Sequence, residues 1–430
     1  MIEQARPWLW RLFAKFEDRG IVYVALRINQ QLLETGRELD ILVHPDSLKP
    51  LLDVIAATCQ EEGDLRVAYW REYPRSAATV VLASRRLDDS WEQCVLDIRS
   101  GVHKKGVLLI DGTKLTPDNR VLDEQLHLRR LPDALESALL LLRNALDERK
   151  MSPRHQAILN ARASGDTGEA ARRLGFDYHA LRAGKPSRVR PANPIRLTRY
   201  RIRAAYGRTR ARTAGLNIAL YGPDGVGKTS QAQELASFLH NPRVRATRPI
   251  VYHAFVKAED LVRYASSKSA ALRRRTYLHA ATHTIRKVLL VLSYLKRLAI
   301  YAVRLRRSIR KGAIIIHDRY LFDVFLKFYK AHGRRYPRLE WRLSRFVPAT
   351  DLVLVLRADP EIVAMRGGEL SPDAVRSAYE ILDHCLEASR SIVVNVDANR
   401  DLEMVRSELG NHVLLFQTKR FTERLPHSKT

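Results

Sequence analysis

A glycine-rich stretch at residues 219–230 carries the residue types that bind phosphate. It reads Ala-Leu-Tyr-Gly-Pro-Asp-Gly-Val-Gly-Lys-Thr-Ser and fits the Walker A pattern, which is Gly, four residues, Gly-Lys-Thr. Glycine lets the backbone curl so tightly that several N–H groups converge on one oxyanion. The alternative is a glycine-rich turn that happens to precede a helix. We predict a nucleoside triphosphate site made of Gly222, Pro223, Asp224, Gly225, Val226, Gly227, Lys228, Thr229 and Ser230.

Four side chains near this stretch have phosphate chemistry of their own. Lys228 is expected to reach the β- and γ-phosphates of ATP, and the hydroxyl of Thr229 to ligate Mg²⁺. A second stretch, Ala-Ile-Ile-Ile-His-Asp-Arg-Tyr at 313–320, contains an acidic and a basic residue side by side. We expect Asp318 to hold magnesium through water and Arg319 to clamp phosphate oxygens with two hydrogen bonds. A surface salt bridge is the alternative for this Asp-Arg pair.

Both stretches fall where a parallel α/β sheet places functional groups. The mostly apolar run at 216–221 predicts a strand before the glycines, and residues 231–239 predict a helix after them. The continuous apolar run before Asp318 is typical of a buried parallel strand, and such sheets bind ligands beyond the carboxyl ends of their strands. Further strands are expected at 249–255, 352–356 and 391–396. The sequence therefore predicts an α/β fold, with a P-loop kinase-type parallel sheet flanked by helices.

Taken together, these pieces resemble thymidylate kinase and its relatives among P-loop nucleoside monophosphate kinases, over about residues 216–415. The resemblance implies a doubly wound parallel sheet and transfer of the γ-phosphoryl group from Mg²⁺–ATP to a nucleoside monophosphate. Met-Arg-Gly-Gly-Glu at 365–369 stands at the family's lid. The resemblance makes Arg366 a catalytic residue alongside Lys228, Asp318 and Arg319, with Arg376 as a second candidate. It also implies that the loop after the strand at 391–396 lines the adenine pocket.

The acceptor side departs from that family. The family's thymidine-reading motif, an acidic-led Arg-Glu-Pro-Gly-Gly stretch after the second strand, is absent, and Tyr-His-Ala-Phe-Val-Lys-Ala-Glu-Asp stands at 252–260. Contacts to the base and the sugar decide which acceptor an enzyme takes. The acceptor is therefore left open as a nucleoside monophosphate or a related phosphate compound.

Three carboxylates near the N-terminus form a second chemical pattern. Glu38 and Asp40 alternate in Glu-Leu-Asp, so both leave one face of a predicted strand, and Asp97 lies on another strand. Three carboxylates on adjacent strands can hold two magnesium ions for nucleotidyl transfer. Residues 24–27 and 37–43 resemble the minimal nucleotidyltransferase type. That family has a Gly-Ser turn where Ile-Asn-Gln-Gln stands here at 28–31, so a structural or degenerate domain is the favoured interpretation.

The chain is expected to contain four segments. Residues 1–120, with an amphipathic helix at 7–19 and short β-type runs after it, predict a nucleotidyltransferase-like α+β domain. From about 122 to 163 the pattern is helical, which predicts a helical connector at 121–185. A proline-containing basic linker follows at 186–215 and the P-loop domain at 216–430.

The composition is that of a globular protein in a reducing compartment. A chain of 430 residues, 46% of them hydrophobic, predicts roughly two or three domains. Cys59, Cys94 and Cys385 are far apart and odd in number, which disfavours a disulfide framework or a zinc cluster. We expect a cytoplasmic location, since residues 1–4 do not begin a signal peptide.

The net charge of +27 is concentrated in two runs without acids, at 178–223 and 261–317. Such runs attract nucleotides, nucleic acid or an anionic membrane surface, and a solvated basic face is the alternative. Residues 278–310 predict a long amphipathic helix that covers the sheet, with attachment to a membrane surface as the lesser alternative.

The basic runs keep other functions open. One is a nucleic-acid-binding P-loop protein with an end-processing or ATPase-switch role. Another follows from analogy, because kinase-like and nucleotidyltransferase-like modules joined in one chain resemble bacterial proteins associated with surface polysaccharide assembly. A nucleotide substrate is the first partner expected, and a homodimer is kept among the partner hypotheses.

Overall fold

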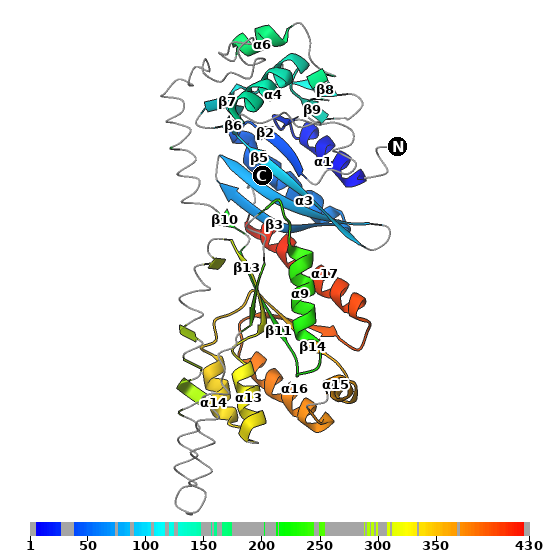
Figure 1. The fold of residues 1–430 in the computed structure, drawn as a ribbon, viewed down its shortest axis with the longest axis vertical. Coiled ribbons are helices and arrows are strands. Elements are labelled where there is room, and N and C mark those ends of the chain that lie inside the picture. The colour runs from blue at the N-terminus through cyan, green and yellow to red at the C-terminus, as the bar shows by residue number, and fades with distance from the viewer. Residues whose placement is uncertain are drawn as a thin grey trace, which may run out of the picture. The chain divides into compact units, whose positions relative to one another are not determined.

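In the computed structural model, the chain divides into two compact units. Unit 1 comprises residues 1–213 and 417–430, and unit 2 comprises residues 214–416. The division differs from the sequence-based segments at residues 417–430, which group with the N-terminal part of the chain. The residues described are 6–26, 38–73, 76–86, 90–104, 107–116, 120–123, 128–147, 156, 159–160, 166–173, 202, 212–213, 215–244, 249–253, 288, 290–292, 294–295, 298–299, 308–309, 312–332, 335–367 and 370–424. Figure 1 shows the elements of both units.

Unit 2 is built on a five-stranded parallel sheet with the strand order β12-β13-β11-β14-β15. The chain's first strand in this unit, β11, lies in the middle, so later strands are added on both sides of it. In open α/β sheets a ligand site lies at such a reversal, outside the carboxyl ends of the strands. The strands are β11 (Leu216–Tyr221), β12 (Ile250–His253), β13 (Ile314–Arg319), β14 (Leu352–Arg357) and β15 (Ile392–Asp397).

Helices lie on both faces of this sheet. One face packs against α13 and α16, because Tyr221 and Val355 of the sheet share a core with Phe325 and Leu382. α9 contacts β11, β12 and β13 outside that core and lies beside α17 (Figure 1). The helices are α9 (Lys228–Leu239), α13 (Asp323–His332), α14 (Pro337–Ser344), α15 (Pro360–Gly367), α16 (Pro372–Glu387) and α17 (Leu402–Arg424). The predicted α/β class is confirmed for this unit, and its parallel sheet is consistent with a P-loop kinase-like fold.

Unit 1 contains a mixed eight-stranded sheet with the order β10-β3-β4-β5-β2-β1-β9-β8. β1 and β2 are antiparallel, whereas β2 and β5 are parallel, and β6 with β7 forms a separate pair. The strands are β1 (Tyr23–Leu26), β2 (Glu38–Val43), β3 (Leu65–Tyr73), β4 (Ala77–Arg85), β5 (Trp91–Arg99), β6 (Gly101–Lys104), β7 (Val107–Asp111), β8 (Val121–Asp123), β9 (Leu128–Arg130) and β10 (Arg212–Thr213).

Helices complete unit 1 as an α+β unit. The apolar face predicted for its first helix is buried: Trp8, Leu9, Leu12, Phe13 and Phe16. The Phe13 ring stacks on that of Tyr23 from β1, with 5.6 Å between ring centroids. The helical elements are α1 (Pro7–Asp18), η2 (Pro45–Ser47), α3 (Leu48–Glu61), η3 (Gly112–Lys114), α4 (Asp133–Asp147) and α6 (Thr167–Arg173).

The predicted helical connector is wrong at its start. β8 and β9 lie there, and β9 pairs in parallel with β1, with Ala25 opposite Arg130. These strands complete the edge of the sheet, so long-range pairing overrides the local helical pattern. The Arg130 guanidinium also donates to Asp123 at 2.9 Å, which joins the two strands. α4 begins after Leu-Pro at 131–132, within the segment where the pattern is helical.

Several predictions fall outside the described residues. They include residues 186–201 and 203–211 of the linker, the acceptor stretch from 254 onward, and most of the two basic runs. Where the segment 278–310 is described it contains helical residues, with Leu290 and Tyr294 buried and Val288 and Leu292 exposed. No helix within the described ranges combines the length and apolar character needed to cross a bilayer.

The last turns of α17 pack within unit 1. The Oγ1 atom of Thr418 accepts a hydrogen bond from the buried backbone N–H of Val67 at 2.9 Å. The register of β3 against β4 shifts between Val67 and Tyr69, so this hydroxyl bonds to the backbone at an irregularity of the ladder. Phe421 lies beside Trp70, with 5.6 Å between ring centroids.

Candidate functional site

The turn between β11 and α9, here called the glycine loop (residues 222–229), depends on backbone angles that favour glycine. Gly222, Gly225 and Gly227 have φ values of 151°, 94° and 95°. A Cβ atom on Gly222 would lie 2.7 Å from Cγ1 of Val226. α9 begins directly after Gly227. The glycine loop therefore leads directly into the N-terminus of α9, where the positive end of the helix dipole suits an anion.

Lys228 lies inside the glycine loop with only 5% of its surface exposed. Its ammonium group donates to the carbonyl oxygens of Gly222 and Pro223, both at 2.7 Å. Burial lowers the pKa of Lys228, and the nearby carboxylates of Asp323 and Asp224 counteract that lowering. The structure thus places the predicted lysine inside the glycine loop, with its ammonium bonded to the loop's own carbonyl oxygens.

Thr229 and Asp318 meet across the site. The Thr229 hydroxyl donates to Oδ2 of Asp318 at 2.9 Å. Parallel pairing of β11 with β13 brings them together, because the carboxyl ends of both strands reach the same edge. Asp318 is 1% exposed, at the end of a strand whose apolar run predicted its burial. A hydroxyl and a carboxylate oxygen are hard donors, so this pair fits Mg²⁺, which proteins hold through one or two carboxylates plus substrate phosphates.

Arg319 connects β13 with the glycine loop. Its guanidinium Nη2 lies 3.1 Å from Oδ1 of Asp224. The alternative stated for this arginine, a salt bridge, is thus observed, but its partner is a residue of the predicted phosphate site. The structure therefore brings Asp224, Lys228, Thr229, Asp318 and Arg319 into one cluster, while Ser230 is exposed on the first turn of α9.

Asp323 is a member of this cluster that was not predicted from the sequence. It starts α13 and is 5% exposed. Burial raises the pKa of Tyr221, and the charge of Asp323 raises it further. The same carboxylate opposes the lowering of the Lys228 pKa. The sequence does carry a sign of its importance, because this acid interrupts the apolar run Leu-Phe-Asp-Val-Phe at 321–325 and acids are rarely buried without a partner.

The two arginines expected at the lid lie in different surroundings. Arg366, in the last turn of α15, donates through Nη1 to the carbonyl oxygen of Ala398 at 3.0 Å. Arg376, on α16, donates to Glu361 at 2.6 Å and to Asp373 at 3.0 Å. Arg366 therefore contacts the loop after β15. That loop is the one which the kinase resemblance assigns to the adenine pocket.

A cavity of about 470 Å³ lies at the carboxyl ends of β14 and β15, lined by Arg357, Ala358, Asn395, Val396, Asp397, Asn399, Arg400 and Glu408. Hydrogen bonds hold its rim in place. Backbone and side-chain N–H groups of Asn399 donate to Oδ1 of Asp397, at 3.1 and 3.0 Å, and the backbone bond is the main reason that the pKa of Asp397 is lowered. Its volume lies within the range of about 300–1,000 Å³ found for small-molecule sites.

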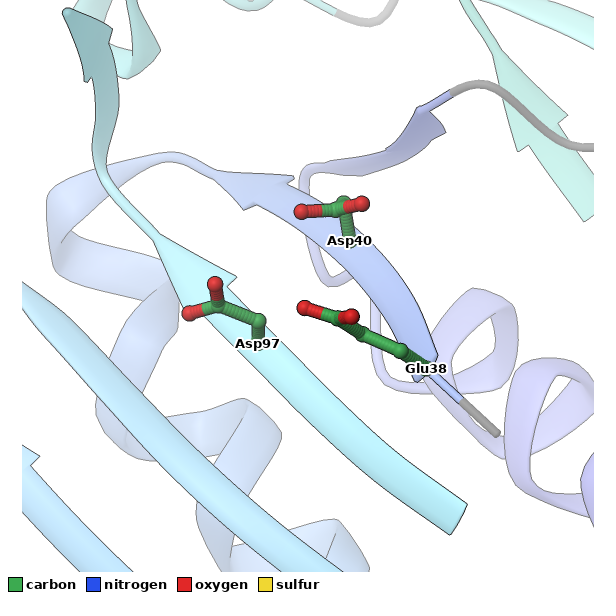
Figure 2. A group of neighbouring side chains, drawn as sticks. All are labelled: Glu38, Asp40 and Asp97. Carbon is green, nitrogen blue, oxygen red and sulfur yellow. The ribbon is translucent and has the colours of Figure 1, made fainter. Parts of the chain in front are cut away.

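The three N-terminal carboxylates come together in unit 1. Asp40 on β2 lies opposite Asp97 on β5, and Glu38 is two residues before Asp40. One oxygen from each of the three lies within 4.8 Å of the others, and all three side chains are partly buried. Figure 2 shows them on the same side of the two strands. The Nε atom of Arg99 donates to Asp97 at 3.1 Å, so one carboxylate of the group also bonds a guanidinium.

Comparison with known proteins finds similarity to solved structures. No protein-family model and no curated protein matches the chain. Among solved structures, the chain is similar to thymidylate kinase from Ehrlichia chaffeensis, at 15% identity and a TM-score of 0.30. The match covers 46% of this chain and 97% of that one.

Proposed function

We propose that unit 2 is a phosphotransferase that uses Mg²⁺–ATP, with a nucleoside monophosphate or a related phosphate compound as acceptor. The observation that carries this proposal is the 2.9 Å contact between the Thr229 hydroxyl and the Asp318 carboxylate, beside a lysine held inside a glycine loop. A magnesium ligand pair, a cationic side chain and convergent backbone N–H groups are what a polyphosphate site requires.

Each residue of the cluster has a role in this proposal. Lys228 binds the β- and γ-phosphates of the donor, and Thr229 with Asp318 holds the magnesium ion. When bound, that ion neutralises charge on the phosphates. Arg319 orients the acceptor phosphate, and Asp224 holds its guanidinium at the loop. No general base is required, because a phosphate acceptor is already anionic.

The test is Lys228→Ala assayed with γ-labelled ATP and a panel of nucleoside monophosphates, sugars and 5′-hydroxyl oligonucleotides. Loss of the phosphate-binding cation should lower transfer on the order of 10²–10³-fold or more. Lys419→Ala is the matched control, because Lys419 is an exposed lysine on α17 with 69% side-chain exposure. Full ATP-dependent transfer by Lys228→Ala would contradict the proposal, and the acceptor that is labelled identifies the substrate class.

We propose as a second candidate function that unit 1 binds divalent cations for nucleotidyl transfer. The supporting observation is the convergence of the Glu38, Asp40 and Asp97 oxygens within 4.8 Å. Mn²⁺ titrated without nucleotide and followed by electron paramagnetic resonance should bind the wild type more tightly than Asp40→Asn or Asp97→Asn. Asp53→Asn, on α3 of the same unit, is the control. Equal Mn²⁺ affinity in all four proteins would leave these carboxylates a structural role only.

A further inference from the structure

The side chain of Arg366 is bound to one backbone carbonyl. It leaves the last turn of α15 and donates to the oxygen of Ala398, 32 residues away, at 3.0 Å. A guanidinium carries donors in a fixed planar fork, and a hydrogen bond to a charged group is about twice as strong as one between neutral groups. Arg366 is therefore suited to fix the position of residue 398.

Ala398 is held on its other side as well. Its backbone N–H donates to the carbonyl oxygen of Arg357 at the end of β14, at 2.6 Å. The following residue, Asn399, accepts a hydrogen bond from the backbone N–H of Asp359 at 2.8 Å. The loop after β15 is thus anchored to the end of β14 by its backbone and by Asn399, and to α15 by Arg366.

This loop forms part of the wall of the cavity at the carboxyl ends of β14 and β15. Asp397, Asn399 and Arg400, which flank Ala398, line the cavity, whereas Arg366 does not. β14 is the direct neighbour of β11, in parallel register, so the cavity and the glycine loop lie at the same edge of the sheet. Arg366 can therefore act on a molecule in the cavity through the backbone of residue 398.

The cavity has the chemistry of a site for a planar heterocycle. The guanidinium groups of Arg357 and Arg400 can stack on an aromatic ring, and Ala358 and Val396 supply apolar surface. The Arg357 guanidinium already lies over the ring of Tyr379, 5.0 Å from its centroid. The amide oxygens of Asn395 and Asn399 already accept from Arg357 and Asp359, so it is their amide N–H groups that could donate to the edge of a base.

From these contacts we infer that Arg366 is a positioning residue for the base of the nucleotide donor. It acts by holding the loop at 398–400 against the cavity through its hydrogen bond to Ala398. This inference rests on the proposed function, since it needs a nucleotide whose phosphates lie in the glycine loop. It assigns Arg366 a different task from the transition-state contact that the kinase resemblance implies.

The test compares a ligand that has a base with one that has none. Binding of Mg²⁺–ATP and of Mg²⁺–tripolyphosphate is measured by calorimetry for the wild type, Arg366→Ala and Arg366→Lys. Arg366→Ala should weaken ATP binding by about tenfold, from loss of one hydrogen bond made by a charged donor, and leave tripolyphosphate affinity unchanged. Arg366→Lys keeps a charged donor and should recover most of the ATP affinity.

The control is Arg345→Ala. It removes an arginine that follows α14 and whose guanidinium lies over Trp341 of that helix, 4.7 Å from the ring centroid. This variant should bind both ligands as the wild type does. Thermal melting of all variants checks that they fold.

Three outcomes overturn the inference. Unchanged ATP affinity in Arg366→Ala, with hydrolysis of saturating ATP slowed by about 100-fold or more, would make Arg366 a catalytic residue instead. Equal weakening of ATP and tripolyphosphate would show that Arg366 acts on the phosphates. A wild type that binds neither ligand would remove the proposed function as well, so failure of the two can be distinguished.

Discussion

At the scale of residues, the site is assembled from positions far apart in the sequence. The Thr229 hydroxyl and the Asp318 carboxylate are separated by 89 residues and lie 2.9 Å apart. Each stands just beyond the end of a parallel strand, and β11 and β13 are neighbours in the sheet. Local sequence sets where each strand ends, and the pairing of the strands then brings the two side chains together.

Replacement of Asp318 tests the magnesium assignment. Asp318→Asn keeps the size of the side chain and an oxygen that accepts from Thr229, but it removes the negative charge. We expect the Mg²⁺ concentration for half-maximal activity to rise by about 10–100-fold, as for other groups that hold a metal through water. A Mg²⁺ titration of ATP-dependent transfer measures this. An unchanged Mg²⁺ requirement would argue that the carboxylate serves only to orient Thr229.

The functional residues that could be predicted from the sequence are those that belong to a local pattern. The residues from Gly222 to Thr229 follow a known spacing, and Asp318 and Arg319 follow a buried strand. Asp323 is marked only as an acid within an apolar run, and the contact of Arg366 with Ala398 follows from no local pattern. They depend on how α13 and α15 pack, which periodicity alone does not encode.

At the scale of elements, the glycine loop shows why glycines with similar φ values differ in importance. Gly222 and Gly227 both have positive φ. A Cβ on Gly222 would also lie 3.0 Å from the carbonyl oxygen of Leu356, at the end of the neighbouring strand β14. At Gly227, no heavy atom of the described residues other than the glycine and its chain neighbours lies within 4 Å of such a Cβ. One position is restricted by space and by backbone angle, the other by backbone angle alone.

We therefore expect Gly222→Ala to damage the loop more than Gly227→Ala. The second change should cost only the strain of the left-handed conformation, about 1–2 kcal/mol. The first adds a steric overlap that must displace Val226 or β14. Thermal melting and ATP binding of both variants measure the difference. Equal losses in the two variants would mean that space beside Gly222 is not limiting.

Glu92, at the start of β5, should make the stability of unit 1 depend on pH. Burial alone would raise the pKa of Glu92, but hydrogen bonds from Arg6 and Arg86 outweigh it, and the pKa is lowered. A lowered folded-state pKa stabilises the protein above the unfolded-state value, and that stability is lost as the pH falls through the folded-state value. We expect unit 1 to lose stability as the pH falls below roughly 4.5, close to the usual value for glutamate.

Arg6→Met tests the source of that dependence. Arg6 directly precedes α1, and its side chain is only 2% exposed. Its guanidinium forms an ion pair with Glu92 of β5. Without this guanidinium the pKa of Glu92 should return toward its ordinary value. Urea unfolding between neutral and acidic pH should then show a weaker loss of stability on acidification than in the wild type. A steeper loss would assign the dependence to other groups.

At the scale of the whole molecule, one helix belongs to both units. α17 starts in unit 2, where the carbonyl oxygen of Leu402 accepts from Gln231 of α9 at 3.2 Å. It ends in unit 1, where Thr418 and Phe421 contact β3. The bond between Thr418 and Val67 spans 351 residues. No local sequence pattern predicts this long-range hydrogen bond. The sequence-based division therefore assigned residues 417–430 to the P-loop domain.

Thr418→Val should destabilise unit 1. Valine has nearly the same shape but no acceptor, so the buried N–H of Val67 loses its partner, at a cost of about 1–3 kcal/mol. Thr422→Val is the matched control, because the Thr422 hydroxyl donates to Lys419 of its own helix at 2.8 Å. Denaturant unfolding followed by tryptophan fluorescence reports on this unit through Trp70. Equal stability of the two variants would contradict the role given to Thr418.

The hydrogen bonds of Lys228 have a consequence for how nucleotides associate. Its ammonium bonds the carbonyl oxygens of both Gly222 and Pro223, so the turn already has its curved conformation before a nucleotide binds. An incoming triphosphate exchanges one set of hydrogen bonds for another and orders little new chain. Association should therefore release only modest heat, and amide hydrogen exchange in the turn should change little.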